Sequence, residues 1–126
     1  MSDKETHNAY LLNYKIWLSS PEAKGIMGDG KWKILKAIHE QGSLKAATES
    51  LGLTYRRTWG DLKEIENQLG FALLEKSRGG KDGGQTRVSA RGLKLIEAFD
   101  NLHQELDVVM EDAFKRFRAK LEEPVD

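Results

Sequence analysis

Two adjacent arginines, Arg56 and Arg57, are the residues of this sequence whose type and position most clearly predict a chemical role. They open a predicted helix over residues 55–69, which follows a shorter helical pattern and a break at the sequence LGL. In a helix-turn-helix, the first turn of the second helix enters the major groove of DNA, where a guanidinium can donate two hydrogen bonds to guanine. Cations at a helix N-terminus also oppose the helix dipole, which favours a functional role over ordinary solvation. We therefore expect both arginines to contact DNA, but their spacing does not decide which one reads a base.

Other polar and basic side chains around this helix are expected to hold the DNA backbone. Some begin the preceding helix, where N-terminal amides commonly face a phosphate. Others flank the arginines, or lie on the glycine-rich segment that follows. Together with the two arginines, this predicted set comprises Ser43, Lys45, Tyr55, Lys63, Arg78, Lys81 and Arg87.

The charges of the chain are unevenly distributed, although 20 basic side chains balance 20 acidic ones. Residues 31–94 carry 13 basic and 7 acidic side chains, a net charge of +6. Residues 95–126 carry 4 basic and 9 acidic side chains, a net charge of −5, and residues 1–30 have a net charge of −1. A basic middle with an acidic end is typical of a polyanion-binding module joined to a separate, non-binding helix. Ordinary scatter of surface charge is the alternative.

Several classes of function are disfavoured by composition and spacing. The chain has no cysteine, which excludes disulfides and thiolate chemistry. It has no P-loop order of glycines and lysine, no GxSxG motif, and no histidine pair with metal-ligand spacing. We therefore expect no catalysis, no metal site and no cofactor. No apolar run is long enough to span a bilayer and no leader segment opens the chain, so we expect a cytoplasmic protein without a membrane partner.

Periodicity and capping residues predict two helices before the arginines. The first covers residues 31–41, with Asp29 as its N-cap and Gly42 as the left-handed residue that ends it. The second covers residues 44–50 and is capped by Ser43. The residues of the second helix expected to point inward are Leu44, Ala47 and Leu51.

The helix over residues 55–69 has one apolar face. Thr54 is expected to cap it by accepting a hydrogen bond from a first-turn amide, and Gly70 to end it. Trp59 is expected to have a structural role, either against or under the hairpin that follows. The core face, at steps of three and four, is Thr58, Leu62, Ile65 and Leu69.

Short strand patterns flank these helices on both sides. At the N-terminal side, residues 10–20 alternate and predict a strand that pairs with a second one near Ile26 and Met27. At the C-terminal side, residues 73–76 and 85–88 predict a hairpin whose tip contains four glycines. The predicted fold class is mainly α with small β hairpins: a winged helix-turn-helix.

A long final helix is predicted over residues 90–121, with Ser89 as its cap. Apolar residues repeat along it in steps of four and three, as in a coiled-coil seam. The likeliest partner of such a seam is the same helix of a second subunit, and packing on the chain's own helices is the alternative. The predicted dimerisation residues are Leu95, Phe99, Leu102, Leu106, Val109 and Ala113.

The strings GSLKAATESLGLTYRRTW, LLEKSRGGKDGG and TRVSARG, with the opening YKIWL and GDGK, resemble the DNA-binding domain of the ModE-type molybdate-responsive regulators. The looser skeleton is similar to LysR-type regulators. The resemblance implies a dimer whose first turn of the recognition helix contacts DNA, and it adds Thr54 to the expected contacts. ModE-type regulators continue into two molybdate-binding domains, which have no counterpart here, so we expect a domain without them.

The expected organisation is a flexible N-terminus over residues 1–9, a DNA-binding domain over 10–94, a dimerisation helix over 95–122 and a tail over 123–126. The expected function is a dimeric transcriptional regulator that binds an inverted repeat of double-stranded DNA, with a link to molybdate metabolism and a possible sensor protein as partner. Two alternatives are a protein-interaction module that retains this fold, and a direct binder of molybdate or tungstate.

Overall fold

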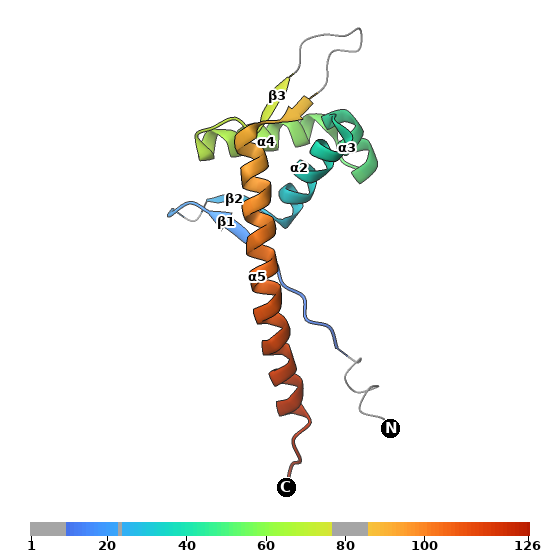
Figure 1. The fold of residues 1–126 in the computed structure, drawn as a ribbon, viewed down its shortest axis with the longest axis vertical. Coiled ribbons are helices and arrows are strands. Elements are labelled where there is room, and N and C mark those ends of the chain that lie inside the picture. Colours follow the sequence, from blue (N-terminus) through green and yellow to red (C-terminus); the bar gives the residue numbers. More distant parts are fainter. Residues whose placement is uncertain (1–9, 23, 77–85) are drawn as a thin grey trace. The chain divides into compact units, whose positions relative to one another are not determined.

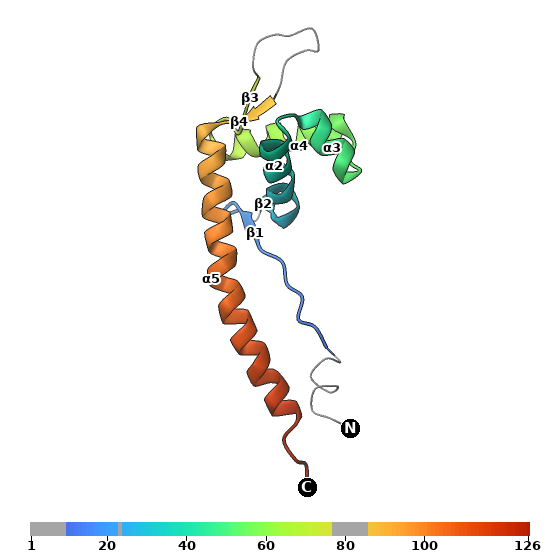
Figure 2. The ribbon, with the colours of Figure 1, turned by 45° about the vertical axis from the view of Figure 1, so that its right-hand side comes forward.

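The computed structural model describes residues 10–22, 24–76 and 86–126 (Figures 1 and 2). The chain forms two compact units: Ile16–Phe99 is one, and Asp100–Asp126 with the N-terminal residues up to Lys15 is the other. The elements in chain order are β1 (Trp17–Ser19), β2 (Gly25–Gly28), α2 (Asp29–Gln41), α3 (Leu44–Leu51), α4 (Tyr55–Leu69), β3 (Leu74–Lys76), β4 (Thr86–Val88) and α5 (Ala90–Leu121).

The helix-turn-helix consists of α3 and α4, with α2 packed against α3 (Figure 2). Its tight connections depend on glycines in the left-handed region, where a side chain would be strained. Gly42, with φ 73°, ends α2, and Gly52, with φ 69°, ends α3. The Leu53 amide then donates to the Thr48 carbonyl oxygen at 2.8 Å, so only three residues separate α3 from α4.

Only one of the three capping residues predicted for α2, α3 and α4 makes the expected cap. Ser43 caps α3 as expected, since its Oγ accepts a hydrogen bond from the Ala46 amide at 2.9 Å. Asp29 is not the N-cap of α2: β2 runs directly into the helix, so Gly28 takes the cap position and Asp29 lies in the first turn. Thr54 is at the N-cap of α4, but its side chain makes no capping hydrogen bond.

The core of this unit lies between the three helices and the base of the wing. The predicted face of α4 is confirmed, because Thr58, Leu62 and Ile65 are buried and Leu69 packs against the core. The prediction that Leu51 points inward is wrong: it is the last residue of α3, where no following turn covers it, and it is exposed. The largest fully buried side chains are Leu35, Ile38, Leu44, Leu62, Leu73 and Thr48.

The wing is an antiparallel pair in which Leu74 lies opposite Val88 and Lys76 opposite Thr86. Its expected tip lies outside the described residues. Ser89 joins the wing to α5 as predicted, because its Oγ accepts a hydrogen bond from the Gly92 amide at 2.9 Å and donates one to the Ala72 carbonyl oxygen at 2.6 Å.

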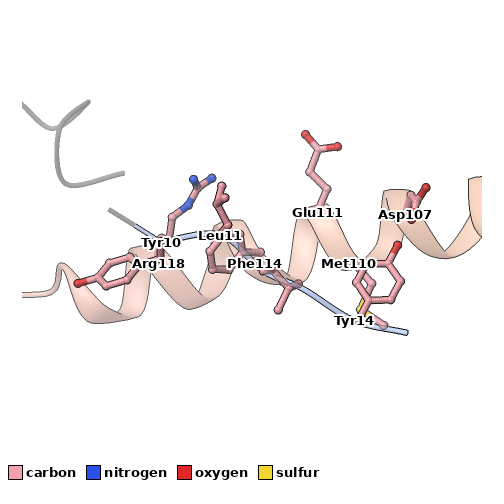
Figure 3. Close-up of a pocket in the computed structure, with 9 residues that line it drawn as sticks. Tyr10, Leu11, Tyr14, Asp107, Met110, Glu111, Phe114 and Arg118 are labelled. Carbon is pink, nitrogen blue, oxygen red and sulfur yellow. The ribbon is translucent and has the colours of Figure 1, made fainter. Parts of the chain in front are cut away.

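The N-terminal hairpin is present but shorter than expected. β1 covers only Trp17–Ser19, because residues 10–16 form no strand; it pairs antiparallel with β2. In the other unit, residues at positions 10–14 lie along α5 instead. They line a groove of about 540 Å³ with α5 residues that include Met110 and Phe114 (Figure 3).

The long helix α5 has the predicted bounds, but the first residues of its seam belong to the core. Phe99 is 2% exposed and its ring centroid lies 5.5 Å from that of Trp32. Leu95 also packs against the core of the Ile16–Phe99 unit. These two residues therefore pack on the chain's own core, which is the alternative that the sequence left open.

One half-buried carboxylate, that of Glu66, joins α4 to the wing. Glu66 Oε2 accepts hydrogen bonds from the Leu73 amide at 2.6 Å and the Leu74 amide at 3.1 Å, while Lys63 Nζ lies 3.0 Å from Oε1. Burial opposes ionisation of Glu66, but the hydrogen bonds from Lys63, Leu74 and Leu73 outweigh it and lower the pKa below its usual value of 4.5.

We predict that Glu66→Gln destabilises the fold by about 1–3 kcal/mol, because buried amides lose a charged acceptor. Urea unfolding at neutral pH measures this difference. A lowered folded-state pKa means that the ionised carboxylate stabilises the fold above the usual value, and that this stabilisation is lost as the pH falls through the folded-state pKa. The difference between the two proteins should therefore shrink below about pH 4.5.

Glu64→Gln is the matched control, since Glu64 is on the same helix and exposed. Its free energy of unfolding should stay within about 0.5 kcal/mol of the parent protein. An equal loss in both variants would contradict the role given to Glu66.

Candidate nucleic-acid interface

The first turn of α4 presents a basic surface to solvent. Tyr55, Arg56 and Arg57 are exposed because the opposite face of the helix, at Thr58 and Leu62, is buried. Among the described residues, neither guanidinium group forms a hydrogen bond or ion pair. Two unpaired guanidinium groups at the start of an exposed helix are available to bind an anionic partner.

The start of α3 adds two of the predicted contacts. Lys45 is exposed on the first turn, and Ser43 is half-buried at the N-cap. The Ser43 oxygen already accepts the hydrogen bond from Ala46, so its remaining capacity is as a hydroxyl donor. Both residues lie at the start of α3, the first helix of the helix-turn-helix, and so belong to the same motif as α4.

Trp59 joins the recognition helix to the base of the wing, in agreement with the structural role expected for it. Lys63 Nζ lies 4.5 Å from the centroid of the Trp59 ring, and Lys76 Nζ of β3 lies 4.8 Å from it. Cations over an indole face are attracted by the ring quadrupole. Lys63, expected to contact DNA, is therefore also held by Trp59 and Glu66.

Lys76 is a basic residue at this site that the sequence did not identify. Lys76 is exposed at the end of β3. The other cation over the Trp59 ring, Lys63, is on α4. No local pattern could have found it, because Trp59 and Lys76 are 17 residues apart and meet only through the packing of β3 on α4.

Arg87 is exposed on β4, whereas its neighbours Thr86 and Val88 are buried. It lines a hollow of about 420 Å³ together with His39 and Gly42 from the end of α2. His39 therefore lies beside Arg87, which is one of the predicted DNA contacts. Arg78 and Lys81 of the expected wing tip lie outside the described residues.

Other kinds of site find no support in the described part of the chain. Residues 10–22, 24–76 and 86–126 contain no group of three or more potential metal-ligating side chains. Among the same residues, none of the helices combines the length and apolar character needed to cross a membrane.

Three helices, a two-stranded wing and an exposed basic first turn on the second helix of the motif define a winged helix-turn-helix DNA-binding protein. Comparison with protein families identifies the branch. Residues 30–93, which are just over half of the chain, match the lysR family of bacterial regulatory helix-turn-helix proteins. The chain belongs to this family, and is thus a DNA-binding transcriptional regulator.

The relatives of this chain include regulators and molybdenum-related proteins. Molybdenum-pterin-binding protein MopA of Rhodobacter capsulatus is 32% identical over 73 residues, which are 58% of this chain and 28% of MopA. The DNA-binding transcriptional dual regulator ModE of Escherichia coli K12 is 31% identical over 71 residues, 56% of this chain and 27% of that protein. ModE of Azotobacter vinelandii is 24% identical over 97 residues, which are 77% of this chain and 34% of that protein. The chain thus spans about a third or less of the length of these relatives.

Solved structures support the same fold. The DNA-binding domain of CbnR, in a crystal complex with DNA, has a TM-score of 0.53 at 22% identity and covers 74% of this chain and 97% of that domain. The BenM DNA-binding domain, in a complex with benA site 1 DNA, has a TM-score of 0.51 at 22% identity. The match covers 70% of this chain and 92% of that domain. The winged helix-turn-helix prediction is confirmed.

We predict that Lys76 contacts a DNA phosphate. Lys76→Gln should then weaken DNA binding to a similar degree for all sequences, because a phosphate contact carries no sequence information. The slope of log affinity against log salt should fall in magnitude by about 1. Fluorescence anisotropy with two unrelated duplexes at several salt concentrations measures both effects. Lys120→Gln, at an exposed lysine near the end of α5, is the control, and an unchanged slope for Lys76→Gln would exclude the contact.

Proposed function

We propose that this protein acts as a dimer and binds an inverted-repeat operator through α4 and the wing. The observation that carries the proposal is the pair of exposed arginines, Arg56 and Arg57, without partners among the described residues. Each α4 of the dimer would enter one major groove, with half-sites about 34 Å apart, one helical turn of DNA.

The flanking residues divide into two roles in this proposal. Thr54, Tyr55 and the arginines read base edges or hold the nearest phosphates. Lys45 and Ser43 at the start of α3, and Arg87 on the wing, bind the backbone on either side. The basic net charge of residues 31–94 supports this arrangement, since it concentrates positive charge on the helix-turn-helix and wing.

We predict that Arg56→Ala and Arg57→Ala each weaken operator binding strongly while the fold is retained. A bidentate arginine–guanine contact discriminates by about 1–3 kcal/mol, which is roughly 5- to 150-fold in affinity. The operator is first selected from random duplex DNA by the full chain, and affinities are then measured on that operator. Lys115→Ala, at an exposed lysine of α5, is the control. Unchanged affinity in both variants would exclude this face of α4.

The dimer interface is proposed on the part of α5 that follows the core. Val109 is 58% exposed, Leu102, Leu106 and Ala113 on the same face of the helix are half-buried, and Phe117 further along is exposed. Exposed apolar side chains in a row along one helix are stabilised by burial against a second helix. The proposed contacts are thus Leu102, Leu106, Val109 and Ala113, with Leu95 and Phe99 assigned to the core.

We predict that Val109→Glu converts the dimer to a monomer, because it places a charge in the apolar seam. Val108→Glu is a closely matched control: Val108 is 61% exposed, but one residue earlier and about 100° around the helix. Sedimentation at several protein concentrations measures the mass. A parent protein that is monomeric at all concentrations would exclude this interface, as would equal effects of the two substitutions.

We further propose that the regulated genes belong to molybdenum metabolism. The motivation is the similarity to MopA and to the ModE proteins. Mapping the selected operator onto the source genome tests this, since operators beside unrelated genes would exclude it. Calorimetry with molybdate and with tungstate tests separately whether this chain itself binds either oxyanion.

A further inference from the structure

Two large apolar side chains are exposed beside the basic turn of α4. Leu53 is 42% exposed and Tyr55 is 43% exposed, on either side of the N-cap residue Thr54. Leu53 lies in the segment that connects α3 to α4, and Tyr55 is the first residue of α4, next to Arg56. Apolar side chains exposed in a cluster at a binding face usually mark a contact with an apolar group of the partner.

The backbone under these side chains is rigid. Gly52 adopts a left-handed conformation, and the Leu53 amide donates to the Thr48 carbonyl oxygen at 2.8 Å. The Thr58 amide donates to the Thr54 carbonyl oxygen at 3.0 Å, which is the first hydrogen bond of α4. Leu53 and Tyr55 are thus held in a defined arrangement before any partner binds.

The two side chains also line a common hollow of about 350 Å³. Its remaining lining residues come from α3: Thr48, which is buried, and Lys45 and Glu49, which are exposed. The Thr48 hydroxyl donates to the Lys45 carbonyl oxygen at 2.9 Å, so its hydrogen atom is not available to a ligand. The hollow therefore presents apolar walls from Leu53 and Tyr55, and its lining also carries one cation, Lys45, and one carboxylate, Glu49.

We propose that Leu53 and Tyr55 bind the C5-methyl groups of thymines in the major groove. This inference rests on the proposed operator binding and adds an apolar contact with bases to the hydrogen bonds proposed for the arginines. The hollow is continuous with the basic turn of α4, since Tyr55 belongs to both and Lys45 is on its rim. The thymine methyl is the one apolar group that bases display in the major groove, so it is the group that apolar side chains there can recognise.

The proposal predicts a composite half-site. The arginines select guanine through hydrogen bonds, and the apolar pair selects thymine within a base pair or two of it, because Tyr55 and Arg56 are neighbours on one helical turn. Deoxyuridine distinguishes this readout from every other one. It pairs as thymine does and leaves the phosphates unchanged, but it lacks the methyl group.

The test uses the full chain and its selected operator, with each thymine replaced in turn by deoxyuridine. At one or two positions in each half-site, the parent protein should lose about 4-fold in affinity, since burial of one methyl group contributes about 0.8 kcal/mol. Leu53→Ala and Tyr55→Ala should bind the thymine operator more weakly, and should lose the deoxyuridine penalty at the position that each side chain contacts.

Conservative variants separate this role from a structural one. Tyr55→Phe keeps the ring and should retain the penalty, and Leu53→Met should retain it in part. Val108→Ala removes an apolar side chain on α5 that is 61% exposed, and should leave both affinity and penalty unchanged. Circular dichroism melting curves verify that each variant is folded.

The possible outcomes are distinct. A parent protein that binds its operator equally well with thymine and deoxyuridine at every position would overturn the methyl readout, while the proposed regulator would stand. Penalties that persist unchanged in both alanine variants would also overturn it. If no duplex is selected at all, the proposed operator binding fails and the methyl readout fails with it.

Discussion

The burial of one face of α4 is the constraint on which the candidate interface depends. Thr58, Leu62 and Ile65 are held in the core, which sets the rotation of the helix about its axis. Arg56 is two residues before Thr58, about 200° around the helix, so it must face solvent when Thr58 is buried. The hydrophobic effect therefore exposes the basic turn although it acts on other residues. A rotation of α4 would expose apolar side chains and bury unpaired guanidinium groups, and both changes are costly.

The wing is placed by polar contacts rather than by its own short strands. A pair of three-residue strands is marginal alone. Glu66 binds two amides at the start of β3, and Trp59 lies between Lys63 of α4 and Lys76 of β3. Both links begin on α4, so the recognition helix and the wing base move as one piece. Such rigidity reduces the entropy lost when several phosphates are bound at once.

The last helix serves two purposes with one repeat of apolar residues. Leu95 and Phe99 pack in the core of the Ile16–Phe99 unit, while Val109, Phe117 and Leu121 remain exposed. Met110 and Phe114 lie in the same stretch of the helix but on a different face from Val109, where residues 10–14 lie along the helix. A heptad pattern therefore does not show that all of its residues pack against the same partner. Periodicity shows which face of a helix is apolar, but not which segment covers that face.

The sequence alone determined the elements and most of their ends. The periodicity of α4, the glycines at Gly42 and Gly70, the Ser43 and Ser89 caps and the bounds of α5 all depend on interactions within a few residues. The LysR-type class was indicated by resemblance, because the strings around the basic turn that carry the resemblance are local. Tertiary structure decided the rest: that Asp29 is not a cap, that Leu51 is exposed, that Phe99 belongs to the core, and that Lys76 lies over Trp59. Each of these depends on which distant segment is adjacent, and the short-range pattern of a sequence holds little information about such long-range contacts.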